Sequence, residues 1–267
     1  MNYEDTSSVI YVERVGAVGK IVLNRPDKRN AMSEAMWSAI PGAVALLDAD
    51  VLVRVIVLTS SSHDAFSAGA DIGELELVAA EPARRESNQK AIRNAQRSLA
   101  RAVKPTIAQI WGACVGGGCG LAIHCDFRYV ATTSRFAITP AKLGIVYPLS
   151  DTKQLVELVG PSNAKSILFT GRMFNAEEAL KMGLVDGIYA ASALEDYVME
   201  FAQQIADVSQ YSVQHMKKFV QRVLDGQTEE DTETEAIFRS AQTGEDAAEG
   251  IRAFLEKRPA NFNWSGD

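Results

Sequence analysis

The sequence has few cysteines, and their arrangement excludes two common uses of that residue. The three cysteines among the 267 residues are Cys114, Cys119 and Cys125. An odd number of cysteines placed so close together does not form a disulfide framework. Their spacing, with only His124 nearby, fits no common zinc pattern. We therefore predict three buried, reduced thiols.

Long apolar runs and basic tracts are also absent. No segment approaches the roughly 18–20 uninterrupted apolar residues of a membrane helix, and residues 1–8 lack the apolar core of a signal peptide. The net charge is -7, and no run of five lysines or arginines occurs. Nucleic-acid binding needs a basic field. We expect a cytoplasmic protein with no membrane or nucleic-acid partner.

Apolar residues make up 47% of the chain, which suits one large core. Runs rich in Val, Ile and Leu predict strands over 9–15, 18–24, 51–59, 105–112 and 127–131. Helical spacing predicts helices between these strands, and almost only helices after Gly160. Strands alternating with helices, then helices alone, indicate an α/β fold with a helical C-terminal part.

Two details of the helices can be predicted from single residues. Ser33 is expected to cap a helix whose apolar face includes Met36, Ile40 and Val44. Proline inside a helix removes a hydrogen bond and clashes with the preceding turn. A kink or break is therefore expected at Pro41. A charged helix is expected over 81–102.

Small residues dominate the loop at 66–72. Residues 67–70, which include Ala68 and Ala70, would let a ligand approach the main chain closely. A helix beginning at Asp71 would present N–H groups that lack intrahelical partners. An ordinary strand-to-helix turn with Asp71 as its N-cap explains the same residues.

A second loop contains Gly116, Gly117 and Gly118 between an expected strand and an expected helix. A helix N-terminus carries a partial positive charge of roughly half a unit. The glycines lack the spacing of a dinucleotide-binding loop and the Lys-Ser/Thr of a P-loop. A tight packing point is the plainer alternative. Together, however, two exposed N–H groups from separate loops can form an oxyanion hole for a carbonyl oxygen.

Several segments resemble, in order, those of the enoyl-CoA hydratase/isomerase (crotonase) superfamily. They lie at 22–26, 29–31, 66–72, 116–126, 143–145, 170–172 and 245–262. The resemblance implies a crotonase-like spiral of ββα turns over 1–200. It also implies a helical region over 201–267 that forms a homotrimer or a dimer of trimers.

The resemblance also implies positions for an acyl-CoA thioester, with coenzyme A as part of the substrate and no permanently bound cofactor. The oxyanion donors would be the N–H groups of Ala70 and Gly117. The remaining implied residues contact coenzyme A: Arg29, Asn30 and Ala31 at the adenine end, Ala68, Asp71, Ile72 and Gly73 along the loop and pantetheine path, and Phe238 and Lys257 from a neighbouring subunit.

Two positions depart from the pattern of the family's hydratases. Those enzymes carry one Glu where this chain has Gly120 and a second where it has Pro140. Hydration needs a group that activates water and a group that protonates carbon, and neither glycine nor proline can titrate. Some relatives carry an Asp where this chain has Pro148.

The segment 139–147 resembles the methylmalonyl-CoA decarboxylase branch and ends at Tyr147. Decarboxylation needs no general base, because carbon dioxide leaves and the oxyanion hole holds the enolate. That branch has His where Ala70 stands. We predict a decarboxylase-like or other lyase or isomerase reaction in preference to hydration, with Tyr147 as a catalytic side chain. A catalytically weak acyl-CoA-binding homologue is the alternative.

Three polar residues follow Tyr147 and could lie at the mouth of a pocket. They are Ser150, Asp151 and Lys153. Asp151 could equally cap a helix beginning at the next residue. His124 is expected near the end of an apolar helix as a core or hydrogen-bonded histidine.

Overall fold

The computed structural model describes residues 8–264 and 266, which form two β-sheets flanked by helices. The larger sheet contains, in spatial order, β1 (Ile10–Val15), β2 (Val18–Leu23), β3 (Val55–Ser60), β5 (Thr106–Ile110), β7 (Phe127–Ala131) and β10 (Gly187–Tyr189). The smaller sheet contains β4 (Ala65–Ser67), β6 (Ala113–Val115), β8 (Arg135–Ala137) and β9 (Phe174–Asn175).

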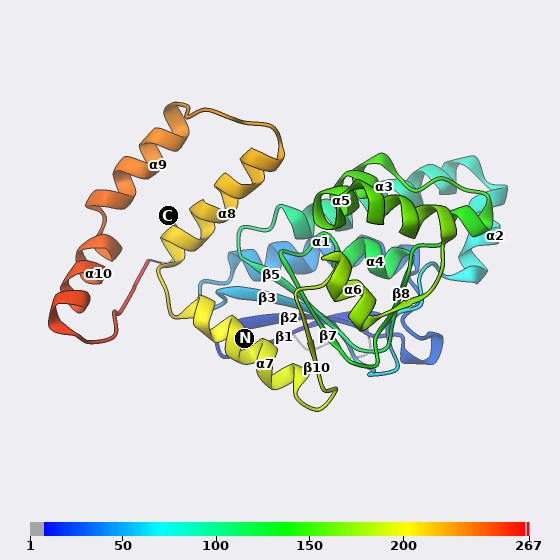
Figure 1. Ribbon diagram of the computed structural model, residues 1–267, viewed down its shortest axis with the longest axis horizontal. Coiled ribbons are helices and arrows are strands. Elements are labelled where there is room, and N and C mark those ends of the chain that lie inside the picture. The colour runs from blue at the N-terminus through cyan, green and yellow to red at the C-terminus, as the bar shows by residue number, and fades with distance from the viewer. Residues whose placement is uncertain (1–7, 265, 267) are drawn as a thin grey trace.

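The chain alternates between the two sheets, and this alternation produces the spiral. It passes from β3 to β4, from β5 to β6 and from β7 to β8, and each pair is followed by helix. The intervening helices are α2 (Ile72–Ala80) with α3 (Pro82–Ala100), α4 (Gly117–Ala122), and α5 (Leu149–Thr170). Figure 1 shows these elements wound around the larger sheet. The predicted α/β spiral of ββα turns is confirmed.

Helix α1 (Glu34–Ala49) begins where the sequence predicted. The hydroxyl of Ser33 accepts a hydrogen bond from the N–H of Met36, and the apolar face is buried. The break expected at Pro41 is wrong, because the helix continues through that residue. Buried Ile40 and Val44 flank the proline and hold both halves in the core, so packing outweighs the lost hydrogen bond.

Other differences concern the short strands. The strand predicted over 51–59 begins only at Val55, after a turn in which the Asp50 carboxylate accepts from the N–H of Leu52. Strands β4 and β6 are three residues each, too short for an apolar period to show. Strands β9 and β10 interrupt the region beyond Gly160 that was expected to be almost entirely helical.

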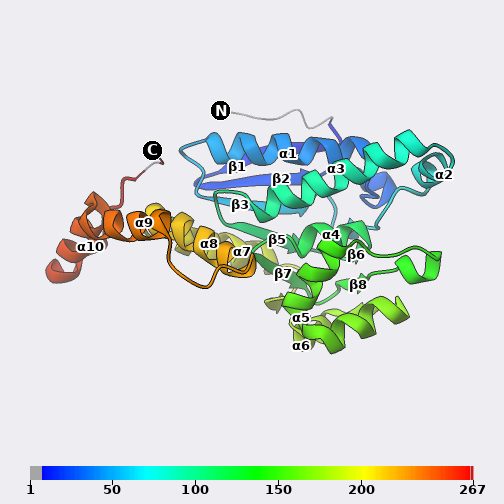
Figure 2. The same ribbon diagram turned by 90° about the horizontal axis from the view of Figure 1, so that it is seen from above.

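The C-terminal helices divide into two groups. Helices α6 (Ala176–Met182) and α7 (Leu194–Ala206) pack on the body, and buried Leu194, Val198 and Ala202 of α7 join the core around the larger sheet. Helices α8 (Gln210–Leu224), α9 (Thr232–Thr243) and α10 (Glu245–Glu256) extend from it as an arm (Figures 1 and 2). The predicted boundary at residue 200 falls inside α7.

The three cysteines lie in the core, as predicted, and all three are free. Burial raises the pKa of the Cys125 thiol to about 12 and that of Cys114 well above its usual range. Both thiols therefore stay protonated and inert. Among the residues that the structure describes, none of the helices has the length and hydrophobicity needed to cross a bilayer.

Candidate active site

The pairing of β4 with β6 aligns the two loops that the sequence singled out. The strands run parallel, with Ser67 opposite Cys114. Ala70 lies three residues beyond Ser67, and Gly117 lies three residues beyond Cys114. Because parallel strands end at the same edge of a sheet, both loops emerge side by side.

The loops touch each other through glycine. A Cβ atom placed on Gly116 would lie 3.7 Å from the Cα of Gly69, and one placed on Gly69 would lie 3.1 Å from the Val115 carbonyl oxygen. Both glycines have positive φ, 100° for Gly69 and 51° for Gly116. A side chain at either position would therefore strain the backbone, and one at Gly69 would also crowd the Val115 carbonyl.

The N–H group of Ala70 points away from the strand-like contact that holds its loop. The Met32 N–H donates to the Gly69 carbonyl at 2.7 Å, and the Asp71 N–H donates to the Met32 carbonyl at 3.1 Å. In this parallel bridge the neighbours of Ala70 make the hydrogen bonds, so its own N–H faces the opposite side.

Gly117 is the first residue of α4, where N–H groups lack an intrahelical acceptor. Within residues 8–264, neither its N–H nor that of Ala70 has an acceptor in the protein. The adjacent Gly116 N–H, by contrast, donates to the Ala137 carbonyl at 2.8 Å. The structure therefore brings two unpaired main-chain donors to adjoining loops.

One helical turn beyond Gly117, position 120 is surrounded by polar atoms. A Cβ atom on Gly120 would lie 2.7 Å from Gln96 Nε2, 3.7 Å from the Tyr147 hydroxyl oxygen and 3.8 Å from Asp151 Oδ2. These groups come from α3, from the segment before α5, and from α5 itself. The space that a side chain at position 120 would enter is thus lined by polar groups from three separate elements.

Asp151 is almost completely buried, with 3% of its surface exposed. Gln96 Nε2 donates to its Oδ2 at 3.0 Å, and the Ser150 hydroxyl donates to its Oδ1 at 3.3 Å. Burial raises the pKa of the Asp151 carboxyl, and His124 and Gln96 partly oppose that rise. The N-cap interpretation is wrong, because α5 begins at Leu149 and the carboxylate turns inward.

The other two polar residues after Tyr147 face solvent. Ser150 and Lys153 are exposed, and Lys153 Nζ donates to the carbonyl of Leu224, the last residue of α8, at 2.9 Å. Lys153 also pairs with Glu157 on the outer face of α5. Of the three residues expected at a pocket mouth, only Asp151 lies beside position 120, and Ser150 reaches that position only through its hydrogen bond to Asp151.

His124 is the hydrogen-bonded core histidine that the sequence predicted. Its Nδ1 lies 2.6 Å from the Gly120 carbonyl oxygen, and its Nε2 lies 3.9 Å from Asp151 Oδ1. A carbonyl only accepts, so Nδ1 donates and Nε2 is left facing the carboxyl group. Burial lowers the pKa of His124.

Tyr147 packs its ring against the core and buries its hydroxyl. That hydroxyl has no hydrogen-bond partner among the residues that the structure describes. Burial raises its pKa well above the usual range, and the Asp151 carboxylate adds to the effect. It is therefore a proton-bearing donor beside position 120. Exposed Ile145, Val146 and Leu149 form an apolar surface around it.

The residues expected at the adenine end build a loop against the first site loop. Arg29 and Asn30 both have left-handed backbone conformations, with φ of 51° and 53°. Asn30 is fully buried: its Oδ1 accepts from the Arg25 N–H at 2.7 Å and its Nδ2 donates to the Ala65 carbonyl at 2.9 Å. Its side chain therefore shapes the loop, while Arg29 is exposed and its carbonyl accepts from the Ala68 N–H.

Asp71 is the N-cap of α2, as predicted. Its carboxylate accepts from the Gly73 N–H at 2.9 Å and pairs with Arg25 at 2.8 Å, and Arg25 lowers its pKa. Arg25 also donates to the Ala31 carbonyl at 2.8 Å, which ties the two loops together. Ile72, the next residue, is 77% exposed and is free to contact a ligand.

Phe238 and Lys257 lie apart from this site. Phe238 belongs to α9, Lys257 ends α10, and both are exposed. The arm that carries them stands at the opposite end of the molecule from α2 (Figures 1 and 2). They cannot contact the Ala70 and Gly117 loops of their own chain.

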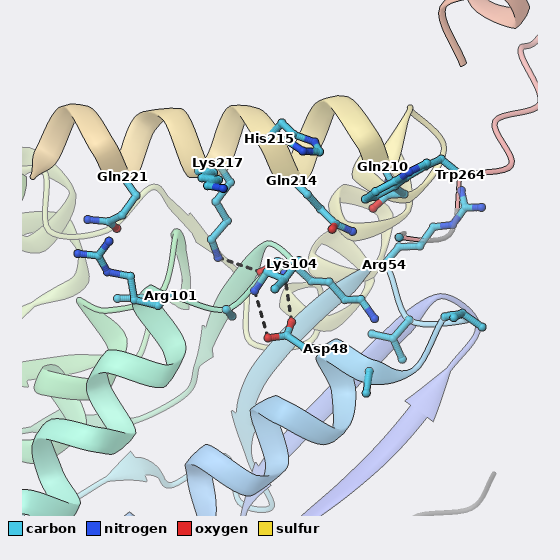
Figure 3. Close-up of a pocket in the computed structure, with 18 of the residues that line it drawn as sticks. Asp48, Arg54, Arg101, Lys104, Gln210, Gln214, His215, Lys217, Gln221 and Trp264 are labelled. Carbon is cyan, nitrogen blue, oxygen red and sulfur yellow. Dashed lines mark hydrogen bonds between the residues drawn. The ribbon is translucent and has the colours of Figure 1, made fainter. Parts of the chain in front are cut away.

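A hollow of about 730 Å³ lies elsewhere, between α8 and the ends of α1 and α3. Basic side chains line it, as Figure 3 shows, and two of them, Arg54 and Lys104, donate to the main-chain carbonyls of Ala206 and Leu47. Lys217 Nζ contacts Asp126 at 2.6 Å, and Arg101 contacts Asp225 at 2.7 Å. Because these basic groups already have partners within the protein, the cleft differs from the two loops, whose Ala70 and Gly117 N–H groups have no acceptor within residues 8–264.

Gln96 was not predicted from the sequence as a site residue. It occupies the buried face of α3 between Ala95 and Leu99, where an apolar residue would be usual. A polar residue on the inner face of an otherwise charged helix is the signal that could have found it.

Comparisons with known proteins agree on one family. The model of the enoyl-CoA hydratase/isomerase family matches residues 13–265. A relative named "Probable enoyl-CoA hydratase" from Rhizobium meliloti is 35% identical over 98% of this chain and 99% of its own length. A crotonyl-CoA hydratase from Syntrophomonas wolfei is 34% identical over the same shares.

Solved structures indicate the same family as the relatives found by sequence. A crystal structure assigned to the enoyl-CoA hydratase/isomerase family, from Hyphomonas neptunium, superimposes with a TM-score of 0.95. It is 40% identical and covers 98% of this chain and 100% of its own. The likeness therefore includes the arm as well as the two sheets.

Proposed function

The chain belongs to the enoyl-CoA hydratase/isomerase family, and from that premise we propose that it converts an acyl-CoA thioester through an enolate. The N–H groups of Ala70 and Gly117 would hold the thioester oxygen as negative charge develops on it. The observation that carries the proposal is the parallel pairing of β4 and β6, which brings both donors to adjoining loops.

Within the family, we propose hydration of a 2-enoyl-CoA as the reaction. The sequence alone favoured a decarboxylase-like reaction, because positions 120 and 140 carry Gly and Pro. Two observations favour hydration instead. Relatives of similar length are named as hydratases, and Asp151 places a titratable carboxyl group beside Gly120.

Crotonyl-CoA tests this proposal directly. Repeated turnover to the hydroxyacyl product, followed through loss of the conjugated thioester absorbance, is the expected result. A second candidate, decarboxylation of methylmalonyl-CoA, is favoured by the buried Tyr147 hydroxyl and by Pro140. Carbon dioxide release from that substrate without hydration of crotonyl-CoA would select it. Binding of both esters without any product would indicate an acyl-CoA-binding protein.

We further propose that the functional unit is a homotrimer or a dimer of trimers. Exposed apolar residues on the arm support the proposal: Val220 and Val223 on α8, and Ile251, Phe254 and Leu255 on α10. Phe238 and Lys257 would then contact the coenzyme A bound by a neighbouring subunit, since they lie far from the site of their own chain.

A further inference from the structure

Position 120 lacks a side chain, yet a carboxyl group lies next to it. The Asp151 Oδ2 atom would be 3.8 Å from a Cβ atom on Gly120. Gly120 itself is three residues beyond Gly117 on α4, so the two positions share one side of the helix, about 4.5 Å apart along its axis. A thioester oxygen on the Gly117 N–H would bring the α- and β-carbons toward this carboxyl group.

We propose that Asp151 takes a proton from water and returns it to the α-carbon of the substrate, in place of a carboxylate at position 120 or 140. This inference rests on the proposed enolate chemistry and names the acid–base group within it.

A single carboxyl group is enough for a balanced hydration. The Asp151 carboxylate accepts a proton from water as the water oxygen bonds to the β-carbon. The π electron pair of the double bond moves to form the enolate, whose oxygen accepts from Ala70 and Gly117. The protonated Asp151 then gives its proton to the α-carbon, the thioester carbonyl reforms, and the carboxylate is restored. One water is added and no co-reactant is needed.

The surroundings of Asp151 suit this task. Gln96 from α3 and Ser150 donate to its two oxygens, and His124, two residues beyond α4, presents Nε2 to it. The Tyr147 hydroxyl lies on the same side of Gly120. Burial raises the pKa of the Asp151 carboxyl and so makes the carboxylate a stronger base than an exposed one. A general base works best when its pKa lies near the operating pH. Tyr147 keeps its own proton and acts only as a donor.

The test compares Asp151→Asn with Glu157→Gln, a carboxyl-to-amide change on the outer face of the same helix. Two rates are measured for each protein: hydration of crotonyl-CoA, and exchange of the α-proton of butyryl-CoA with deuterium, followed by mass spectrometry. Asp151→Asn is expected to lower both rates by about 100-fold or more. The dissociation constant of butyryl-CoA should stay unchanged, and Glu157→Gln should match the wild type.

The outcomes separate the two proposals. Wild-type rates in Asp151→Asn would overturn the role of Asp151 and leave the proposed function intact. In a second outcome, the wild type exchanges the α-proton of butyryl-CoA but does not hydrate crotonyl-CoA, and Asp151→Asn loses the exchange. That result would overturn hydration as the reaction and support Asp151 as the acid–base group. A wild type that neither hydrates nor exchanges would overturn both.

Gln96→Met provides a second test that does not depend on the Asn variant folding. Gln96 lowers the pKa of Asp151 through its hydrogen bond, so its removal raises that pKa. Because the reaction needs the carboxylate, the acidic limb of the rate profile should move to higher pH. A loss of rate with an unmoved limb would assign Gln96 a purely structural role and contradict titration of Asp151.

Discussion

At the scale of single residues, Tyr147 combines a ring packed in the core with a buried hydroxyl beside position 120. Its hydroxyl is buried and unpaired within the described part of the protein, and such groups cost about 1–3 kcal/mol. Tyr147→Phe removes only the hydroxyl and keeps the ring in the core.

We expect Tyr147→Phe to lower kcat by about tenfold to 100-fold and to leave coenzyme A ester binding nearly unchanged. The melting temperature should hold or rise, because the orphan hydroxyl is gone. Steady-state kinetics with titration calorimetry and a thermal melt check these points. An equal effect on kcat and on binding would remove Tyr147 from the mechanism.

Asp71 gives a prediction about pH and stability. Its folded-state pKa lies below the ordinary 3.8 because of Arg25, so its contribution is present above that pH and is lost as pH falls through the folded pKa. Asp71→Asn keeps a capping side chain but loses the ion pair. The free energy of unfolding should fall by about 1 kcal/mol at pH 7, and the difference should shrink below pH 3.8 in denaturant titrations. A constant difference at all pH values would contradict this origin.

At the scale of elements, two glycines in helices have opposite roles. A Cβ atom on Gly117 would lie 2.8 Å from the Trp37 ring, whereas one on Gly42 in α1 would meet nothing within 4 Å. Gly117→Ala is therefore expected to displace the oxyanion donor and to lower kcat by about 100-fold or more.

Gly42→Ala is the matched control for that change. Alanine in an exposed helix interior is favoured over glycine by about 0.8–1 kcal/mol, so this variant should be more stable and fully active. Thermal melts and crotonyl-CoA kinetics measure both variants together. Loss of activity in Gly42→Ala, or full activity in Gly117→Ala, would contradict the assignment of the donor.

At the level of helices and strands, some features of the site could be predicted from the sequence and others could not. The glycine loops stand out because small residues cluster around expected strand ends, and Asp71 and Ser33 appear as caps through local rules. The pairing of β4 with β6 could not be predicted, because three-residue strands carry no period. The cluster at Gly120 was also hidden: Gln96 and Asp151 come from two helices, His124 comes from the turn after α4, and the three meet only through tertiary packing.

At the scale of the whole molecule, we predict that the arm formed by α8, α9 and α10 mediates the assembly of subunits. Phe254 is 83% exposed on α10, next to exposed Ile251 and Leu255, and exposed apolar patches of this kind mark interaction sites. Phe254→Glu should shift the protein from trimers or hexamers toward monomers in light scattering coupled to size exclusion. Leu46→Glu, on the outer face of α1, should leave the assembly unchanged. A wild-type monomer, or an unchanged Phe254→Glu assembly, would contradict this use of the arm.

The proposed oxyanion donors, at Ala70 and Gly117, are main-chain N–H groups, which has a consequence for how this family can change by mutation. A codon change replaces a side chain but cannot delete an N–H, except by introducing proline. Substitutions at positions 120, 140 or 151 can therefore alter the proton chemistry while the loops from β4 and β6 keep their donors. Proteins with this fold can therefore change from one reaction to another while they continue to bind the thioester oxygen.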